Sequence, residues 1–367
     1  MILAAVLLAL VACAPRPLAT VADAPYKWTP VDPPVAPLTV SVSLFDVTYA
    51  FSSGELHRAI VDPASLATVA DTPLGKGTDV NAIAGTASLV IEDDGGVAIV
   101  NGQGVRQKFG PPVSPLPVGA SSATGTVYIG DRDWISIVGA DGIVMRSFDA
   151  PRAKPGTPVL PTAYKGVLQP NGSHVSAFVF GAAGSFVAVS GSANSALVDM
   201  DSGARVDLIG FAPVVDVASD GANAYVLGHD TASLDRPFVL AEVDLATLDI
   251  TRVRRFTVDQ PVKTPEGERV LVTQRGDVYV YFAVPIADGG GAPVRSLLLR
   301  FDAAFAPDRA RLPDDLGLDV VVGADGALYF FGGPAGNVVS RVDPMTRDIT
   351  PYAVAPAGSH VRALIAR

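Results

Sequence analysis

From Ser41 to its C-terminus the sequence repeats one pattern of short strands and tight turns, and this repeat limits the fold more than any other feature. Its first half is a glycine turn followed by a strand of alternating residues, as in Gly276-Asp277-Val278-Tyr279-Val280. Two-residue alternation is typical of a strand with one buried face, and glycine supplies the positive φ of a tight turn. Further copies begin at Asp94, Gly125, Gly184, Asp220 and Asp325.

The second half of each repeat is an apolar strand that ends in an aspartate turn and leads into another strand. An aspartate side chain can accept a hydrogen bond from a nearby backbone N–H, which favours such turns. Clear copies have their aspartate at 62, 199, 244, 302 and 343, and weaker copies lie at Asn101 and Asp141. The pattern therefore occurs seven times, with four short strands in each copy and no convincing helix.

This repeat predicts an all-β fold, a seven-bladed β-propeller over residues 40–367. The 36 glycines and 30 prolines fit a chain that is dense in turns. The first blade begins with the strand Ser41–Phe51 but lacks an inner strand, whereas the final strand Ser359–Ile365 has no sheet of its own. We therefore expect the C-terminal strand to enter the first blade as its innermost strand, which closes the ring and removes two sheet edges.

The glycine turn and the Val-Asp turn of each repeat resemble the blades of YVTN, NHL and gluconolactonase-like propellers. The resemblance covers residues 40–367 and concerns architecture. The chain lacks the Trp-Asp dipeptides of WD repeats and the periodic glycine doublets of kelch repeats, and its only tryptophans are Trp28 and Trp134. The resemblance leaves two kinds of function open: a non-catalytic binding or scaffold module, or a metal-dependent lactonase or lyase that uses the propeller channel.

The N-terminus carries an uncharged apolar run, Ile2–Ala12, that ends at the only cysteine of the chain, Cys13. Eleven apolar residues are too few for a membrane-spanning helix, which needs about 20, but suit the core of a signal peptide. No Lys or Arg precedes the run. Leu10-Val11-Ala12-Cys13 resembles a bacterial lipobox, which implies a signal peptide over 1–12 and acylation of Cys13, palmitate included. An ordinary secretory signal is the alternative.

Export to the cell envelope follows from this resemblance, with the outer membrane as the destination in a Gram-negative host. Residues 14–39 hold seven prolines, and proline fixes φ and cannot donate a backbone hydrogen bond. We expect 13–39 to be the lipidated cysteine followed by an extended tether. Its 26 residues after Cys13 could reach on the order of 80 Å if fully extended.

Charge and cysteine content exclude several classes of function. The net charge of −10, from 27 basic and 37 acidic side chains, argues against a nucleic-acid-binding surface. A single cysteine excludes intramolecular disulfides and Cys-type zinc sites. The motifs G-x-S-x-G, H-E-x-x-H and the P-loop are absent. We expect a monomer that contacts the membrane through Cys13 and a protein, glycan or small ligand through its loops.

Loops carry function on a rigid scaffold, and in a propeller the loops between blades and between second and third strands share one face. The longest candidates are 149–172, 228–237, 257–268 and 284–294. Innermost strands begin at the same face. Aligning their starts places five candidate residues at the channel mouth: Asp79, His174, Arg269, Asp319 and His360.

Asp79, Asp319 and His360 would come from adjoining blades. With the nearby amide of Asn81 they could hold a divalent metal or supply a general base. The alternative is that they are solvated channel lining. A shift of one residue in register would move a side chain to the other face of its sheet, so the sequence leaves both readings open.

Overall fold

The computed structural model describes residues 42–77, most of residues 174–367, and separate strands at residues 19–21 and between residues 79 and 149. The described residues are 19–21, 42–77, 79–82, 89–93, 96–100, 106–109, 118–120, 127–130, 134–138, 144–149, 174–191, 194–233, 237–258, 266–273, 275–285, 294–313, 316–344, 346 and 348–367. The apolar run before Cys13 and Cys13 itself lie outside this set. So do residues 150–173, 234–236, 259–265 and 286–293 of the four long loops.

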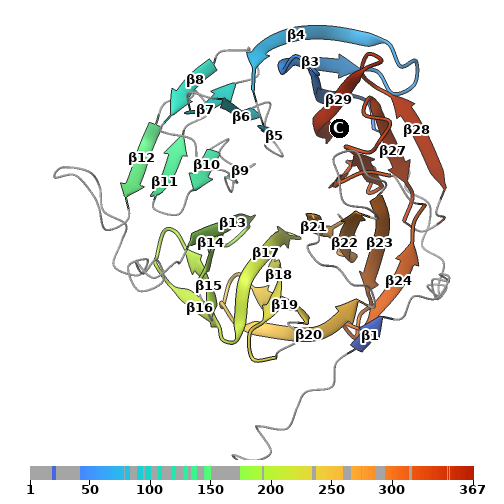
Figure 1. Ribbon diagram of the computed structural model, residues 1–367. Coiled ribbons are helices and arrows are strands. Elements are labelled where there is room, and N and C mark those ends of the chain that lie inside the picture. Colours follow the sequence, from blue (N-terminus) through green and yellow to red (C-terminus); the bar gives the residue numbers. More distant parts are fainter. Residues whose placement is uncertain are drawn as a thin grey trace, which may run out of the picture.

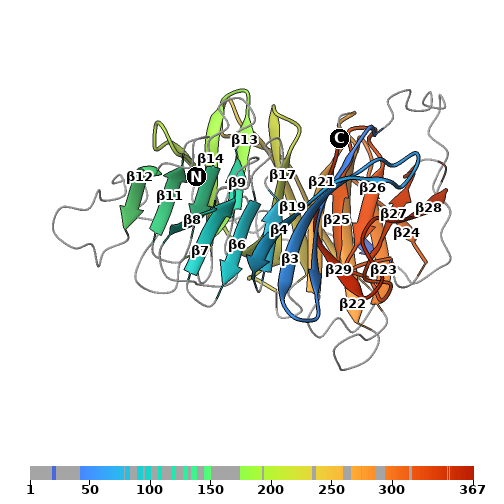
Figure 2. The ribbon, with the colours of Figure 1, turned by 90° about the horizontal axis from the view of Figure 1, so that it is seen from above.

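The described strands form seven sheets arranged in a ring, with the first strand of each sheet innermost and the last at the rim (Figure 1). Figure 2 shows the ring from its side, with the strands running between its two faces. The prediction of an all-β propeller is confirmed. Within the described part of the chain, no helix has the length and apolar character needed to cross a bilayer.

We number the sheets as blades in chain order. Blade 1 consists of β29 (Ser359–Ala366), β2 (Phe45–Phe51), β3 (Glu55–Val61) and β4 (Thr68–Lys76), and blade 2 of β5 (Asp79–Ala82), β6 (Leu89–Asp93), β7 (Gly96–Val100) and β8 (Arg106–Phe109). Blade 3 consists of β9 (Val118–Ala120), β10 (Val127–Gly130), β11 (Trp134–Val138) and β12 (Val144–Asp149). Blade 4 consists of β13 (His174–Gly181), β14 (Gly184–Ser190), β15 (Ser195–Asp199) and β16 (Arg205–Leu208). Blade 5 consists of β17 (Phe211–Ser219), β18 (Asn223–Asp230), β19 (Phe238–Asp244), β20 (Ile250–Val258) and β1 (Ala19–Val21). Blade 6 consists of β21 (Glu266–Val272), β22 (Val278–Pro285), β23 (Val294–Phe301) and β24 (Pro307–Arg311). Blade 7 consists of β25 (Asp319–Val322), β26 (Leu328–Phe331), β27 (Val338–Val342) and β28 (Ile349–Ala353).

The C-terminal strand β29 occupies the innermost position of blade 1. It pairs antiparallel with β2 from Phe45↔Ala366 to Phe51↔Ser359. Backbone hydrogen bonds also join it to blade 7, from the N–H of Val361 to the carbonyl of Gly336 at 2.7 Å. The two ends of the chain's repeat region thus meet in one sheet, as the sequence predicts.

Apolar side chains from facing blades form the core between them. Phe45, Val47 and Leu364 of blade 1 pack with Tyr329 and Val339 of blade 7, and each is at most 2% exposed. The same arrangement recurs between blades 4 and 5, 5 and 6, and 6 and 7. Strand residues of one face therefore belong to one seam and those of the other face to the next, which fixes the register of each blade.

The aspartate turns have the hydrogen bonds that the sequence predicts. The side chain of Asp62 accepts the N–H of Ala64 at 2.8 Å, and that of Asp244 accepts the N–H of Ala246 at 2.8 Å. Asp199, Asp302 and Asp343 accept backbone N–H groups in the same way. The hydroxyl of Ser65, with the N–H of Ala64, lowers the pKa of Asp62, and the backbone N–H groups of Thr247 and Ala246 lower that of Asp244.

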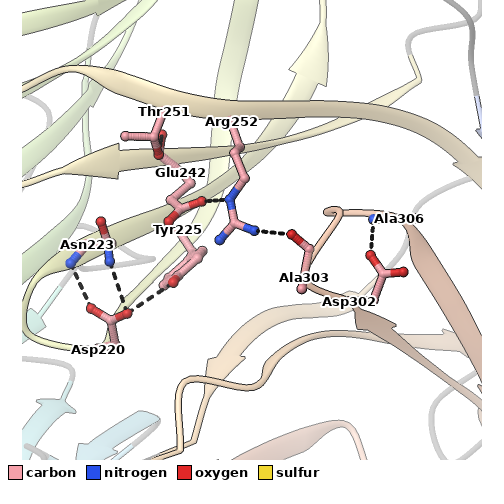
Figure 3. Close-up of polar contacts among 9 residues, drawn as sticks. All are labelled: Asp220, Asn223, Tyr225, Glu242, Thr251, Arg252, Asp302, Ala303 and Ala306. Carbon is pink, nitrogen blue, oxygen red and sulfur yellow. Dashed lines mark hydrogen bonds and ion pairs between the residues drawn. The ribbon is translucent and has the colours of Figure 1, made fainter. Parts of the chain in front are cut away.

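A second polar motif joins blades 5 and 6 (Figure 3). Tyr225 donates its hydroxyl to Asp220 at 3.0 Å, inside the turn that precedes β18. On β20, Arg252 pairs with Glu242 and donates from Nη1 to the carbonyl of Ala303 in blade 6 at 3.0 Å. These contacts tie a turn to its own blade and one blade to the next.

Part of the proline-rich segment is itself in the fold. β1 pairs in parallel with the outer edge of β20, with Thr20 opposite Thr257. The strand, dark blue in Figure 1, lies at the rim beside β20 and β24. Proline cannot donate a hydrogen bond to a central strand, but an edge position for residues 19–21 is compatible with prolines on either side.

Candidate functional site

The strand order places the long loops and the starts of the innermost strands at the same face of the ring. Neighbouring strands in a blade run in opposite directions, so connections after the second and fourth strands return to the end where the first strand begins. The four long segments connect β12 to β13, β18 to β19, β20 to β21 and β22 to β23. We call this end the long-loop face. The candidate residues all lie at or near the first residues of innermost strands on it.

Two of the predicted residues, Arg269 of β21 and Asp319 of β25, form an ion pair. Arg269 Nη2 donates to Asp319 Oδ1 at 2.6 Å, and Arg269 Nη1 donates to the carbonyl of Glu268 at 2.9 Å. The side chains of Arg269 and Asp319 are 41% and 38% exposed, so solvent reaches both. The pair joins blade 6 to blade 7 and remains accessible to a ligand.

A third charged residue, Asp216 of β17, approaches the pair from blade 5. Its Oδ2 accepts the backbone N–H of Val270 at 2.7 Å. Burial raises the pKa of the Asp216 carboxyl, while the positive charge of Arg269 and the Val270 N–H oppose this rise. Arg269 therefore interacts with carboxylates from both neighbouring blades.

Glu268 is the buried member of the group. Its side chain is 7% exposed, and Oε1 has no hydrogen-bond partner among the described residues. Burial raises the pKa of Glu268 to about 7, with the charge of Arg269 opposing the rise and the charge of Asp216 adding to it. A buried carboxylate without a partner is costly, and this cost is the cause of the raised pKa.

Arg269 stays charged in these surroundings. Burial disfavours its charged form, but the carboxylates of Asp319, Asp216 and Glu268 outweigh this effect and raise the pKa of the guanidinium. We call Asp216, Glu268, Arg269 and Asp319 the inner-strand charge cluster. It brings together one fixed positive charge, an accessible carboxylate and two carboxyls whose pKa is raised by burial.

Irregular strand pairing positions the cluster. The register of β21 against β22 shifts by one residue between Glu266 and Arg269, and β17 has register shifts on both sides of Val214. A bulge re-aims the side chains beside it. Val270 packs in the seam with blade 5, whereas Arg269 reaches Asp319 in blade 7. The cluster thus spans two seams from one strand.

The other predicted site residues are placed less completely. His360 is exposed at the start of β29, where its imidazole lies against Gly336: a Cβ added to that glycine would be 2.1 Å from His360 Nδ1. The described contacts of Asp319 include Arg269 but not His360. Asp79 begins β5 and His174 begins β13, but their side chains lie outside the described residues, as does that of Asn81.

No group of three or more His, Cys, Asp or Glu side chains in the described part of the chain is arranged to hold a metal ion. Because the Asp79 side chain lies outside that part, a metal at the start of blade 2 stays a prediction. For Asp319 the described geometry supplies a different partner, the guanidinium of Arg269.

Sequence reasoning missed Asp216 and Glu268. A signal for each is present: Asp216 interrupts the apolar run Val214-Val215-Asp216-Val217, and Glu268 stands beside Arg269 at the start of an innermost strand. A charge within a buried strand requires a partner, which points to a neighbouring opposite charge.

The strand order defines the chain as a β-propeller protein with a charged cluster on its innermost strands. No protein-family model matches the sequence, and a comparison with curated proteins finds no match. Among solved structures, the chain is similar to the WD40 domain of Pan2 from Neurospora crassa, with 10% identity, a TM-score of 0.47 and coverage of 89% of this chain and 87% of that one. It is also similar to apo AztD from Citrobacter koseri, with 11% identity, a TM-score of 0.48 and coverage of 86% and 84%. At these values neither likeness assigns a function.

Proposed function

We propose that this chain is a cell-envelope lipoprotein, anchored through Cys13, whose propeller is a non-catalytic binding module for a protein or glycan. The observation that carries the binding role is the half-exposed Arg269–Asp319 pair on the long-loop face. Leu10-Val11-Ala12-Cys13 supports the anchor.

The pair offers a ligand both donors and acceptors. A guanidinium has more N–H donors than the two described hydrogen bonds of Arg269 use, and the Asp319 carboxylate presents a second oxygen beside Oδ1. Sugar hydroxyls and peptide amides both need donors and acceptors side by side. The backbone carbonyl of Glu268 and the Asp319 carboxylate hold Arg269 in place, so little side-chain entropy is lost when a ligand binds.

An apolar residue lies on the same face. Ile209, in the turn between β16 and β17, is 79% exposed. That turn follows a fourth strand and therefore reaches the long-loop face. An exposed isoleucine on the same face as a polar cluster suits a binding surface that combines apolar contact with hydrogen bonds.

Photo-crosslinking in the intact envelope tests the proposal. Benzoylphenylalanine at Ile209 would report on the long-loop face, and the same residue at Leu66, 42% exposed in the turn between β3 and β4, would report on the opposite face. We expect adducts from position 209, fewer of them when Arg269→Met is added, and none from position 66. Equal adducts from both faces, or none from position 209, would contradict binding at the long-loop face.

A further inference from the structure

The N-terminal strand β1 is paired with the propeller, which distinguishes residues 19–21 from a free tether. Residues 19–21 pair with residues 256–258 at the outer edge of β20, and the strand also lies beside β24 of blade 6. Its place is therefore the rim of the seam between blades 5 and 6 (Figure 1).

The seam between blades 5 and 6 is closely packed and hydrogen-bonded. Phe256, the partner of Ala19 in the pairing, is fully buried in the core shared by blades 5 and 6. Arg252 on the same strand bonds across the seam to Ala303, and its guanidinium lies 4.7 Å from the centre of the Phe305 ring. A strand added here is attached to the rigid body of the ring.

Because β1 is paired with the propeller, only the residues between Cys13 and Ala19 separate the proposed lipid-bearing cysteine from the body of the protein. Six residue steps separate Cys13 from Ala19. At no more than about 3.6 Å per residue, these steps span roughly 20 Å, against about 80 Å for the whole segment fully extended.

We propose that β1 is a docking strand that holds the propeller close to the lipid on Cys13, with the rim of blades 5 and 6 directed toward the membrane. The membrane consequence rests on the proposed acylation of Cys13, whereas the docking itself does not. With this rim toward the bilayer, the axis of the ring lies along the membrane and the long-loop face opens sideways.

A cysteine pair tests the docking directly, because the chain has no cysteine other than Cys13. In the Cys13→Ala protein, Thr20→Cys and Thr257→Cys would occupy paired positions on strands about 4.8 Å apart, which a disulfide can bridge. The matched control combines Thr20→Cys with Val253→Cys, four residues and about 13 Å further along β20. We expect the paired thiols to oxidise at least about tenfold faster than the control. Equal rates, in variants that melt as the parent does, would overturn the docking.

A quenching experiment tests the orientation in the lipidated protein, where acylation blocks the thiol of Cys13. A fluorophore would be attached to Ile250→Cys on β20 or to Val69→Cys on β4, both exposed and on opposite sides of the ring in Figure 1. In phosphatidylethanolamine–phosphatidylglycerol vesicles with a nitroxide-labelled lipid, we expect stronger quenching at position 250. We also expect Thr20→Pro, which removes a backbone donor, to abolish the difference.

The two experiments separate the docking from the anchor. Fast oxidation with equal quenching at positions 250 and 69 would overturn the orientation. If Cys13→Ala protein stays with membranes while the paired thiols still oxidise fast, the anchor is wrong and the docking strand stands.

Discussion

Arg269 and Asp319 lie fifty residues apart in the sequence, yet their side chains meet at 2.6 Å across the seam between blades 6 and 7. Ring geometry explains this closeness, because β21 and β25 are neighbouring innermost strands and both residues lie at the long-loop end. Arg269 also lies near Asp216 and Glu268, and the three carboxyl groups together raise the pKa of its guanidinium.

Replacing Arg269 by methionine should destabilise the ring, because Asp216 and Asp319 would lose their common counter-charge. We expect a loss of about 1 kcal/mol at pH 8, since the half-exposed pair is screened by water. The loss should shrink at pH 5, where the Glu268 carboxyl, whose pKa is about 7, holds a proton, and Asp216, whose pKa burial also raises, is more readily protonated. Chemical denaturation at both pH values measures it. Arg205→Met is the matched control, because Arg205 forms an exposed pair with Asp207 within one strand and should cost almost nothing.

The buried carboxyl of Glu268 should make stability depend on pH. Its pKa rises from 4.5 to about 7 on folding, so the folded protein keeps a proton that the unfolded chain has lost. The free energy of unfolding should therefore fall as the pH rises from about 4.5 to 7, by on the order of 3 kcal/mol, and stay low above pH 7. Glu268→Gln should remove most of this fall and stabilise the protein at pH 8. Asp216, whose pKa is raised in the same direction, should leave a smaller fall in place.

If Glu268→Gln instead lowers stability equally at pH 5 and pH 8, the carboxyl is ionised at both values and the cluster is wrongly described.

The C-terminal strand should be essential although chain ends usually tolerate truncation. Deleting residues 358–367 would remove β29, expose the edge of β2 and open the seam between blades 1 and 7. We expect insoluble protein or a large drop in the melting temperature. Arg362→Ala, an exposed change on the same strand, is the control and should melt as the parent does. A soluble truncated protein with an unchanged melting temperature would show that β29 does not close the ring.

Asp319→Ala should not change the effect of divalent cations on the melting temperature of chelator-stripped protein, because the Asp319 carboxylate already has Arg269 as its partner. The comparison is a melting curve with and without calcium, manganese or zinc. A bound cation at a hundredfold excess over its Kd would stabilise the fold by about 2.7 kcal/mol. A rise in melting temperature that Asp319→Ala abolishes would reverse this expectation and favour the metal-dependent enzyme.

The sequence predicts the repeat well because each repeat contains its own local signals. Glycine turns and aspartate turns act within a few residues, and Asp62 and Asp244 form the bonds expected of them. The position of β29 follows from counting strands, since an unpaired last strand and an incomplete first blade complete each other.

The site depends on information that local patterns lack. Arg269 reaches blade 7 and Val270 packs against blade 5 because neighbouring strand residues point to opposite faces, and the register shift before Arg269, which no short pattern specifies, sets this phase against β22. The pairing of β1 with β20 joins residues more than two hundred positions apart, and three residues without a distinctive pattern carry it. Long-range pairing of short edge strands is therefore the part of this fold that sequence reasoning misses.

Fractionation of cells that produce the parent protein or Cys13→Ala shows whether lipid on Cys13 holds the propeller at a membrane. We predict that the parent is found in the membrane fraction and carries an acylated Cys13 at its mature N-terminus by mass spectrometry. We predict that Cys13→Ala accumulates as precursor or appears as soluble protein. Cys13→Ala protein that is processed normally and still fractionates with membranes would contradict the lipoprotein account.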